Sequence, residues 1–386
     1  MTSESKPSLH LRSLAAQALG SIEPMTKGVV TPVHVATTFI RDPDNQYRSG
    51  FSYARPDNAT ARQAEAVIAA LEGAAEAALF GSGMAASTAV ILALDPSAHI
   101  VASKVMYWAF RQWLTTAALR YGYTVDIVDT ADLDAVRKAV RPGETRLVFI
   151  ETPGNPLWTI TDIAAIAEIS HAAGAKLVVD STVATPVFTQ PLSLGADIVM
   201  HSASKYLNGH SDVIAGALAT ARDDELWQRI RTVRAQHGGI IGGVEAWLLL
   251  RSLRTLHVRV AAQAASAADL AHLLLAHPEV ADVLYPGLNH HPGHAIAARQ
   301  MAGGFGAMLS IRVRKGEAAA IATAAHVDVW KRATSLGGVE SLIEHRASVE
   351  GPDSPCPPDL LRLSVGLEHA DDLYNDLDQA LRRAAA

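Results

Sequence analysis

The amino-acid sequence predicts an α/β protein whose larger part is a mainly parallel sheet with helices on both faces. Between about residues 60 and 250, short runs rich in valine, isoleucine and leucine alternate with longer segments of helical apolar spacing. The short runs do not alternate between apolar and polar residues, which is typical of strands buried on both faces. Ligands on such sheets bind beyond the carboxyl ends of the strands.

The expected elements of this region alternate along the chain. Helices are expected over 60–71, over 84–94 after the turn Gly81-Ser-Gly83, and over 163–173. Strands are expected at 77–80, 99–102, 125–128, 146–150, 176–179 and 197–200.

Changes in pattern divide the chain into three parts. Residues 1–57 form an N-terminal arm of short polar stretches and turns, with one β-like run over 33–39. Residues 58–250 form the large domain. Residues 251–386 form a smaller α+β domain, linked to the first by a long helical stretch over 243–275. Its expected strands are 307–313 and 360–365, and an amphipathic helix over 370–382 follows.

The composition excludes several classes of protein. With 386 residues, 49% hydrophobic and 19% charged, the chain is an ordinary globular protein. Its net charge of −6 argues against nucleic acids or anionic membranes as partners. No apolar run approaches the roughly 20 residues of a membrane span, and the first residues lack the apolar core of a secretory signal. The single cysteine, Cys356, allows no intrachain disulfide, so we expect a cytoplasmic protein.

We expect no metal site. One cysteine cannot form a cysteine zinc cluster. The histidines His290, His291 and His294 lie in a turn rich in proline and glycine without a nearby carboxylate pair, which is typical of a solvated loop.

One lysine, Lys205, occurs in a setting that favours covalent chemistry. It follows the apolar strand expected at 197–200, where a charged amine is costly unless it is neutralised, paired or covalently bound. Ser202 and Ser204 lie three residues and one residue before it and could bind a phosphate. This group suits an amine that carries a phosphorylated aldehyde as a Schiff base. The alternative is a solvated lysine at a strand end.

Three other features could meet Lys205 at the strand ends, and each has an ordinary alternative. The segment Gly81-Ser-Gly-Met84 opens a helix whose free N–H groups can bind phosphate, although glycine turns before helices are common. Asp180 ends a strand and could keep a ring nitrogen protonated, or it could serve as a turn aspartate. Arg362 interrupts an apolar strand and could bind a carboxylate, or it could reach water at a strand edge.

The chain resembles the pyridoxal-phosphate enzymes of cysteine and methionine metabolism, a family that includes cystathionine γ-synthase, cystathionine γ- and β-lyases and methionine γ-lyase. The resemblance runs from about residue 28 to the C-terminus. The matching blocks are Tyr53-Ala-Arg55 with Asn58-Ala-Thr60, Gly81-Ser-Gly-Met84, Glu151-Thr-Pro-Gly-Asn-Pro156, Asp180-Ser-Thr182, Ser202-Ala-Ser-Lys-Tyr206, Ser335-Leu-Gly-Gly-Val-Glu-Ser-Leu342 and Arg362-Leu-Ser-Val-Gly-Leu-Glu368. The resemblance implies the fold of fold-type I pyridoxal-phosphate transferases.

The resemblance also implies residue roles. Lys205 forms the Schiff base with pyridoxal 5′-phosphate and moves protons, and Tyr107 and Tyr53 are further catalytic candidates. The implied cofactor-binding residues, besides Lys205, are Asp180, Gly83, Met84, Ser202, Ser204, Tyr107, Asn155 and Thr182, together with Tyr53 and Arg55 from a neighbouring subunit. The implied substrate-binding residues are Arg362, Ser335 and Asn155. Because active sites are shared between subunits, the resemblance implies a homodimer as the minimal unit and a homotetramer built from such dimers.

The implied reaction is γ-elimination or γ-replacement on a small amino acid with a heteroatom at Cγ, as in trans-sulfuration between cysteine and methionine metabolism. Other reactions on the same scaffold remain open: methionine γ-lyase-like cleavage, β-elimination as in cystathionine β-lyase, and transamination. A non-catalytic protein that binds the cofactor for regulation is an alternative of another class. The retention of Lys205, Asp180 and Arg362 argues against that alternative.

The sequence departs from its relatives mainly at the substrate end. The stacking tyrosine is followed by bulky residues, in Tyr107-Trp-Ala-Phe110, which either narrow the substrate pocket or pack away from it. Thr334 stands where cystathionine-handling relatives often have an acidic residue, which argues against cystathionine as the preferred substrate. The usual Glu-His-Pro-Ala is Glu344-His-Arg-Ala347, so that Arg346 and Glu350 either face the pocket or form a surface pair.

Overall fold

The computed structural model describes residues 9–351 and 354–386. The first eight residues of the predicted arm, and part of the proline-rich loop after Glu350, lie outside this range.

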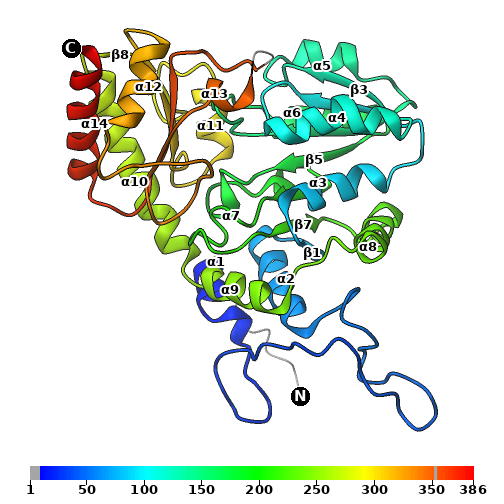
Figure 1. Cartoon of the computed structure of the whole chain (residues 1–386). Coiled ribbons are helices and arrows are strands. Elements are labelled where there is room, and N and C mark those ends of the chain that lie inside the picture. Colours follow the sequence, from blue (N-terminus) through cyan, green and yellow to red (C-terminus); the bar gives the residue numbers. More distant parts are fainter. Residues whose placement is uncertain (1–8, 352–353) are drawn as a thin grey trace.

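The larger sheet has seven strands, which are β1 (Glu76–Phe80), β2 (His99–Ser103), β3 (Thr124–Val128), β4 (Thr145–Glu151), β5 (Lys176–Asp180), β6 (Ile198–His201) and β7 (Gly216–Thr220). Their order is β1-β7-β6-β5-β4-β2-β3 (Figure 1). Only β7 runs against its neighbours, β1 and β6, and all other pairs are parallel. The predicted α/β class with a mainly parallel sheet is therefore confirmed. Strand β7 was not predicted, because Gly-Ala-Leu-Ala-Thr has little of the β-branched character of β2 to β6 and lacks the phenylalanine that ends β1.

Helices cover both faces of this sheet. They are α2 (Ala59–Glu72), α3 (Gly83–Leu92), α4 (Trp108–Arg120), α5 (Leu133–Ala139), α6 (Ile163–Ala172) and α8 (Glu225–His237). On β4, Leu147 and Phe149 belong to the core that contains α3 and α4. Val148 and Ile150, which point the opposite way, belong to the core that contains α5 and α6. This arrangement explains why the strand sequences are apolar throughout and do not alternate.

The second sheet has five strands, which are β8 (Val280–Leu284), β9 (Met308–Val313), β10 (Lys331–Arg332), β11 (Leu342–His345) and β12 (Leu360–Ser364). Their order is β10-β11-β12-β9-β8, so β12 is internal. Helices α10 (Leu256–Leu275) and α12 (Glu317–Ala325) pack on this sheet, and α14 (Ala370–Ala385) packs on both helices. The remaining helices are α1 (Leu11–Ala16), α7 (Thr185–Phe188), α9 (Gly243–Leu253), α11 (His294–Gln300) and α13 (Ala347–Glu350), with 3-10 turns at Ala18–Gly20 and Pro191–Leu194.

The stretch expected as one long helix over 243–275 is two helices, α9 and α10, with a break at Arg254 and Thr255. At the break, the Thr255 N–H donates to the Ser252 carbonyl, three residues back, at 3.1 Å. The buried Arg259 of α10 then donates to the carbonyls of Tyr206 and Ser252 at 2.9 and 3.0 Å. The guanidinium of Arg259 therefore forms hydrogen bonds both with the loop that follows Lys205 and with the end of α9.

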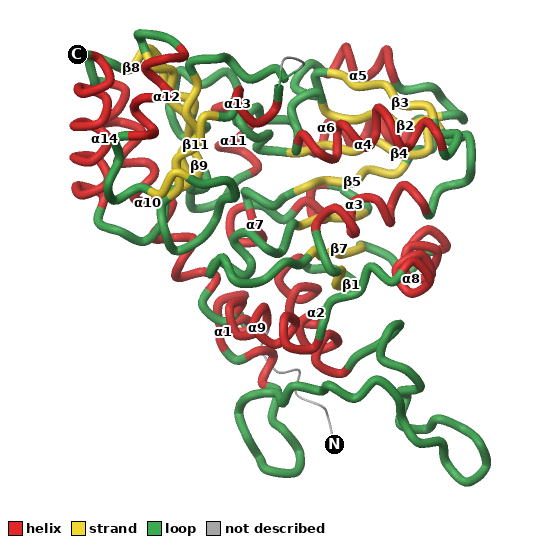
Figure 2. The backbone as a smooth tube through the Cα atoms, in the orientation of Figure 1, coloured by secondary structure: helices red, strands yellow, loops and turns green. Residues whose placement is uncertain are grey.

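The arm does not contain the strand expected over 33–39. Its described residues lie mostly in loops at one end of the molecule, and Thr38 forms only an isolated bridge with Tyr53 (Figure 2). Apolar side chains of this segment are exposed, with Val35 at 76% and Ile40 at 95%. Within residues 9–351 and 354–386, no strand lies beside this segment, so no ladder forms.

Candidate active site

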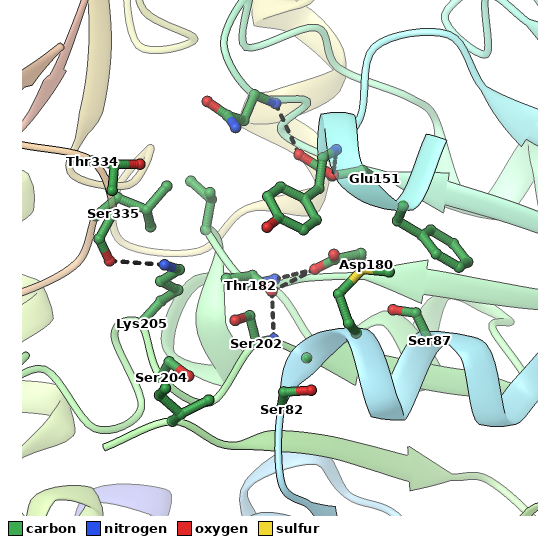
Figure 3. A pocket seen from close by; sticks show the side chains of 18 of the residues that line it. Ser82, Ser87, Glu151, Asp180, Thr182, Ser202, Ser204, Lys205, Thr334 and Ser335 are labelled. Carbon is green, nitrogen blue, oxygen red and sulfur yellow. Dashed lines mark hydrogen bonds between the residues drawn. The ribbon is translucent and has the colours of Figure 1, made fainter. Parts of the chain in front are cut away.

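A cavity of about 540 Å³ lies at the carboxyl ends of the parallel strands, facing the segment that leads into β11 (Figure 3). Most residues predicted for the site line it: Lys205, Tyr107, Asp180, Gly83, Met84, Ser202, Ser204, Asn155, Thr182 and Ser335. Tyr53, Arg55 and Arg362 are not among its lining residues.

Asp180, the last residue of β5, is buried at the floor of the cavity. Its Oδ1 accepts hydrogen bonds from the Thr182 N–H at 2.9 Å and from Thr182 Oγ1 at 2.5 Å. Thr182 Oγ1 accepts from the Ser202 N–H at 2.8 Å, which links the ends of β5 and β6 (Figure 3). Burial raises the pKa of Asp180, and the hydrogen bonds from Thr182 oppose that change.

Glu151, to which no role was assigned from the sequence, ends β4 and pairs in register with Asp180. Its two oxygens accept the backbone N–H groups of Tyr107 at 2.7 Å and Asn155 at 2.9 Å. Burial, followed by the charge of Asp180, raises the pKa of Glu151 well above its ordinary value. Among the described residues no ion pair is formed by Glu151 or Asp180, and the raised pKa values of both mean that a cationic ligand on the cavity floor would favour their ionised forms. Two acidic residues at the ends of successive predicted strands were the sequence signal for this pair.

Lys205 points into the cavity from the loop after β6. Its Nζ donates to Ser335 Oγ at 2.7 Å, across 130 positions of sequence. Burial, with a contribution from the charge of Arg362, lowers the pKa of Lys205 to about 8. The solvated-lysine alternative is therefore wrong for this residue, which is half-buried and, with a pKa of about 8, has a larger neutral fraction at physiological pH than an ordinary lysine.

The start of α3 forms the cavity wall below Lys205. Ser82 caps the helix by accepting the Ala85 N–H at 3.0 Å. A Cβ at Gly83 would lie 2.9 Å from Ser202 Oγ, so only glycine lets the helix start approach the end of β6 this closely. Ser204 Oγ accepts the Ala215 N–H at 2.8 Å. The Ser204 hydroxyl also donates to the Ala215 carbonyl at 3.2 Å. The helix start thus presents N–H groups, and Ser202 a hydroxyl group, to one corner of the cavity, where they can bind an anion.

The aromatic residues after β2 divide between cavity and interior. Tyr107 is 43% exposed and lines the cavity. Phe110 also lines it, with its ring 4.8 Å from that of Phe149. Trp108 is not among the lining residues and meets Tyr107 edge-on at 6.4 Å. Of the two bulky residues, only Phe110 lines the cavity, and its side chain is otherwise buried in the core beside β4.

Arg362 is buried on the internal strand β12, so the expectation of a strand-edge arginine reaching water is wrong. Its Nη2 donates to the Ser335 carbonyl at 2.6 Å, and its Nη1 donates to Asn155 Oδ1 at 3.3 Å. Both partners line the cavity. Arg362 therefore lies directly behind the wall to which Asn155 and Ser335 belong. Burial, followed by the charge of Arg346, lowers its pKa to about 10.

Comparisons with known proteins identify the family. The family model described as Cys/Met metabolism PLP-dependent enzyme matches residues 13–382. The chain belongs to this family. Its members' cofactor, pyridoxal 5′-phosphate (PLP), is therefore the cofactor of this chain.

Individual relatives indicate the type of enzyme within the PLP-dependent family. A cystathionine γ-synthase of Mycobacterium tuberculosis is 45% identical over 365 residues, which cover 93% of both chains. A cystathionine γ-lyase of Bacillus subtilis is 39% identical and covers 92% of this chain and 95% of the relative. The solved cystathionine γ-synthase of Xanthomonas oryzae pv. oryzae, in complex with aminoacrylate and cysteine, superposes with a TM-score of 0.94 at 36% identity, covering 98% of this chain and 99% of that chain. The chain is a PLP-dependent enzyme of the cystathionine γ-synthase and γ-lyase type, within the trans-sulfuration family.

The cavity of this PLP-dependent enzyme fits its cofactor chemically. Lys205 provides an amine of lowered pKa for the cofactor's aldehyde. The buried Asp180, without a cationic partner among the described residues, suits a protonated ring nitrogen. The corner at the start of α3 suits a phosphate.

Arg346 and Glu350 were expected either to face the pocket or to form a pair on the surface. Arg346 and Glu350 do pair, but both are buried, with 2% and 3% of their side chains exposed. Neither lines the cavity. The pair lies behind Arg362 and shares Glu344 with it, so the expectations of a surface pair and of pocket-facing residues are both wrong.

Two further expectations concern the histidine-rich turn and membrane-spanning helices. His291 is buried and burial lowers its pKa to about 4, so the description of its turn as a solvated loop is wrong for this residue. Across residues 9–351 and 354–386, no helix combines the length and hydropathy needed to cross a membrane.

Proposed function

We propose that this enzyme catalyses γ-elimination or γ-replacement on a small amino acid that carries a heteroatom at Cγ. When bound, PLP supplies the electron sink that makes loss of the Cα proton feasible. The protein must then hold the cofactor, bind the amino acid by its carboxylate and move protons between carbon and leaving group. Relatives named cystathionine γ-synthase and γ-lyase support this reaction class over others on the same scaffold.

The observation that carries the proposal is the environment of Lys205. An amine with a pKa of about 8 is partly neutral at physiological pH, whereas an ordinary lysine is almost entirely protonated. Such a group can attack an aldehyde and can later accept a proton from Cα and release it elsewhere. The hydrogen bond from Nζ to Ser335 Oγ fixes its direction at the cavity mouth.

At the cofactor end we propose the roles that the family resemblance implies, for residues that line one cavity. Asp180, which accepts hydrogen bonds from Thr182, would bind the ring nitrogen, and Thr182 and Asn155 would contact the ring. Tyr107, exposed in the cavity, would stack on the ring. Gly83, Met84, Ser202 and Ser204 bind the phosphate.

At the substrate end, Arg362 binds the α-carboxylate together with Asn155 and Ser335. Its contacts with those two cavity residues support this role. Tyr107, and Tyr53 from a neighbouring subunit, are the candidates for proton transfer at the leaving group. Thr334 lines the cavity without charge, so a distal ammonium group would find no carboxylate at that position.

We further propose that the active form is a homotetramer of dimers in the cytoplasm, with residues 1–57 as the arm, 58–250 as the PLP-binding domain and 251–386 as the C-terminal domain. Tyr53 and Arg55 do not line the cavity of their own chain, and apolar arm residues such as Val35 and Ile40 are exposed. Both features suit an arm that covers a second subunit and supplies Tyr53 and Arg55 to its phosphate.

A panel of substrates tests the reaction. The purified holoenzyme is incubated with methionine, cystathionine, homocysteine and acylated homoserines, and products are identified by mass spectrometry. Release of 2-oxobutyrate and ammonia indicates γ-elimination, and formation of a thioether with added cysteine indicates γ-replacement. Pyruvate as the main product indicates β-elimination and contradicts the proposal, as does the absence of turnover on every substrate.

Mixing two inactive variants tests the shared site. Lys205→Ala and Arg55→Ala subunits are unfolded together and refolded as a mixture. If Arg55 acts across the dimer, mixed dimers contain one site with both residues intact and activity returns. No recovery, with dimers present by light scattering, places Arg55 in its own subunit's site.

A further inference from the structure

A buried cluster of three charged residues lies behind Arg362. Glu344 is on β11, Arg346 follows it, and Glu350 ends α13. We call these residues the Arg346 cluster. No role was assigned to the cluster in binding or catalysis from the sequence. The inference below rests on the proposed function, in which Arg362 binds the substrate carboxylate.

Glu344 is shared between two guanidinium groups. It lies opposite Arg362 in the antiparallel register of β11 and β12. Its Oε2 accepts from Arg362 Nη2 at 2.6 Å and from Arg346 Nη1 at 2.8 Å. Both cations therefore draw on the same carboxylate oxygen.

Glu350 holds Arg346 from the other side. Arg346 donates to Glu350 Oε1 through Nε at 3.1 Å and through Nη2 at 2.7 Å. Ser354 Oγ donates to the second oxygen, Oε2, at 2.5 Å. The exposed fractions of the Arg346, Glu350 and Glu344 side chains are 2%, 3% and 10%, so the contacts form with little competition from water.

The charge distribution has a consequence for Arg362. A lone Glu344 would neutralise Arg362 and weaken its attraction for an anionic substrate, especially in a buried setting. A second cation on the same oxygen divides that carboxylate's charge between two partners. Glu350 offsets the positive charge of Arg346, but it contacts Nε and Nη2 of the guanidinium, whereas Glu344 contacts Nη1. Arg362 therefore keeps more positive charge toward the cavity than a simple ion pair would leave.

We propose that Arg346 is a positioning residue for substrate binding: by sharing the Glu344 oxygen that contacts Arg362, it reduces the neutralisation of Arg362 by that carboxylate and leaves Arg362 able to bind an α-carboxylate. The family's usual residue here is proline, which can neither donate a hydrogen bond nor carry charge. Arg346 therefore places a second buried cation beside Arg362.

Ligand binding to the holoenzyme tests the inference. L-Norvaline has an amine and a carboxylate but no leaving group, and butan-1-amine is the same molecule without the carboxylate. Dissociation constants are measured by calorimetry and by the shift of the cofactor's absorbance band. The double variant R346Q/E350Q removes the pair without leaving an uncompensated buried charge.

We expect R346Q/E350Q to bind L-norvaline about tenfold more weakly than wild type, and to bind butan-1-amine within about twofold of wild type. With substrate, KM should rise more than kcat falls. Arg346→Lys keeps the positive charge but cannot contact Glu344 and Glu350 with the same planar geometry. Its affinity for L-norvaline should therefore lie between those of wild type and R346Q/E350Q. Unchanged L-norvaline affinity in R346Q/E350Q, or equal losses for both ligands, would overturn the inference.

Two controls keep the test decisive. If R346Q/E350Q does not fold, R346M/E350M fills the same space with apolar side chains and is held to the same criteria. Arg362→Ala serves as the reference: it should lose affinity for L-norvaline and keep affinity for butan-1-amine. If Arg362→Ala has no effect, the proposed carboxylate site is wrong; if only the Arg346 variants have no effect, the inference about Arg346 alone is wrong.

Discussion

The two walls of the cavity are built in different ways. The wall formed by the large sheet is fixed by contacts between neighbouring strand ends, such as Asp180 with Thr182 and Thr182 with Ser202. The wall formed by the second sheet depends on contacts between distant segments: Lys205 with Ser335, and Arg362 with Asn155 across 207 positions. The first wall contains Lys205, Asp180 and the start of α3, which match the cofactor motifs of the resemblance, and it contains one departure, at Phe110. The second wall contains the departure at Thr334, and the departure at Arg346 lies behind it. The comparison teaches that the cofactor residues of this chain depend mainly on local contacts and the proposed substrate residues on contacts between distant segments.

The large-sheet wall is tested most strongly by Lys205→Ala. We expect turnover to fall by at least about 10³-fold, because one side chain provides both cofactor attachment and proton transfer. The fold should persist, as measured by circular dichroism and thermal unfolding, since Lys205 forms one side-chain hydrogen bond. Turnover above a tenth of wild type would show that another group performs the chemistry.

The second wall is tested by Arg362→Ala. We expect substrate binding to weaken by roughly 2–5 kcal/mol, because a charge-assisted pair is lost while Glu344 stays buried. Steady-state kinetics should show the loss mainly in KM. Arg362→Lys is the matched control, which keeps the charge and loses the planar geometry, and should retain part of the affinity. An unaltered KM would place the carboxylate elsewhere.

Thr334→Glu tests whether substrate choice is set at the second wall. A carboxylate at this cavity position should raise the preference for cystathionine over an acylated homoserine by about tenfold, through pairing with the distal ammonium. Thr334→Gln, similar in size but uncharged, should not produce this change. The ratio of kcat/KM values for the two substrates is the measurement, and an equal response of both variants would argue against a charge effect.

Ser335→Ala tests the contact that joins the two walls. Loss of the hydrogen bond to Lys205 Nζ should lower kcat by about five- to tenfold, the equivalent of about 1 kcal/mol. Ser193→Ala, on the exposed surface, is the control and should have wild-type kinetics. Wild-type kcat in Ser335→Ala would show that the direction of Lys205 is set by other contacts.

The pH dependence of cofactor capture tests the electrostatic environment of Lys205. Burial and the charge of Arg362 lower the pKa of Lys205 to about 8, and only the neutral amine attacks an aldehyde. The rate at which apoenzyme binds PLP should therefore rise from pH 6 to about pH 8 and level off above it. In Arg362→Ala the pH at which the rate levels off should be higher, because the positive charge of Arg362 no longer lowers the pKa of Lys205. Stopped-flow absorbance gives both profiles, and a rate in wild type that keeps rising toward pH 10 would contradict the lowered pKa.

Much of the fold could be predicted because its signals are local. Apolar strands, the Gly81-Ser-Gly83 turn and the residues after β5 and β6 all appear as continuous segments of sequence. Strand β7 escaped prediction because its small residues gain their strand conformation from pairing on both sides. The prediction of a strand over 33–39 was wrong for the opposite reason: among the described residues, this strand-like sequence forms only one isolated bridge, from Thr38 to Tyr53.

The site divides in the same way. Asp180, Lys205 and the phosphate corner followed from motifs, whereas the Glu151 pair depends on which strands become neighbours. The burial of Arg346 and Glu350 depends on the packing behind β12, which no local pattern encodes. Sequence therefore predicted the individual side chains better than their partners across the two sheets.

The most direct measurement is peptide mass spectrometry of the holoenzyme after reduction with borohydride. Reduction should abolish the yellow absorbance band and leave a pyridoxyl group on the peptide that contains Lys205, and on no other lysine. An unmodified Lys205 peptide, or a pyridoxyl group on a different lysine, would contradict the assignment on which the cofactor and substrate roles depend.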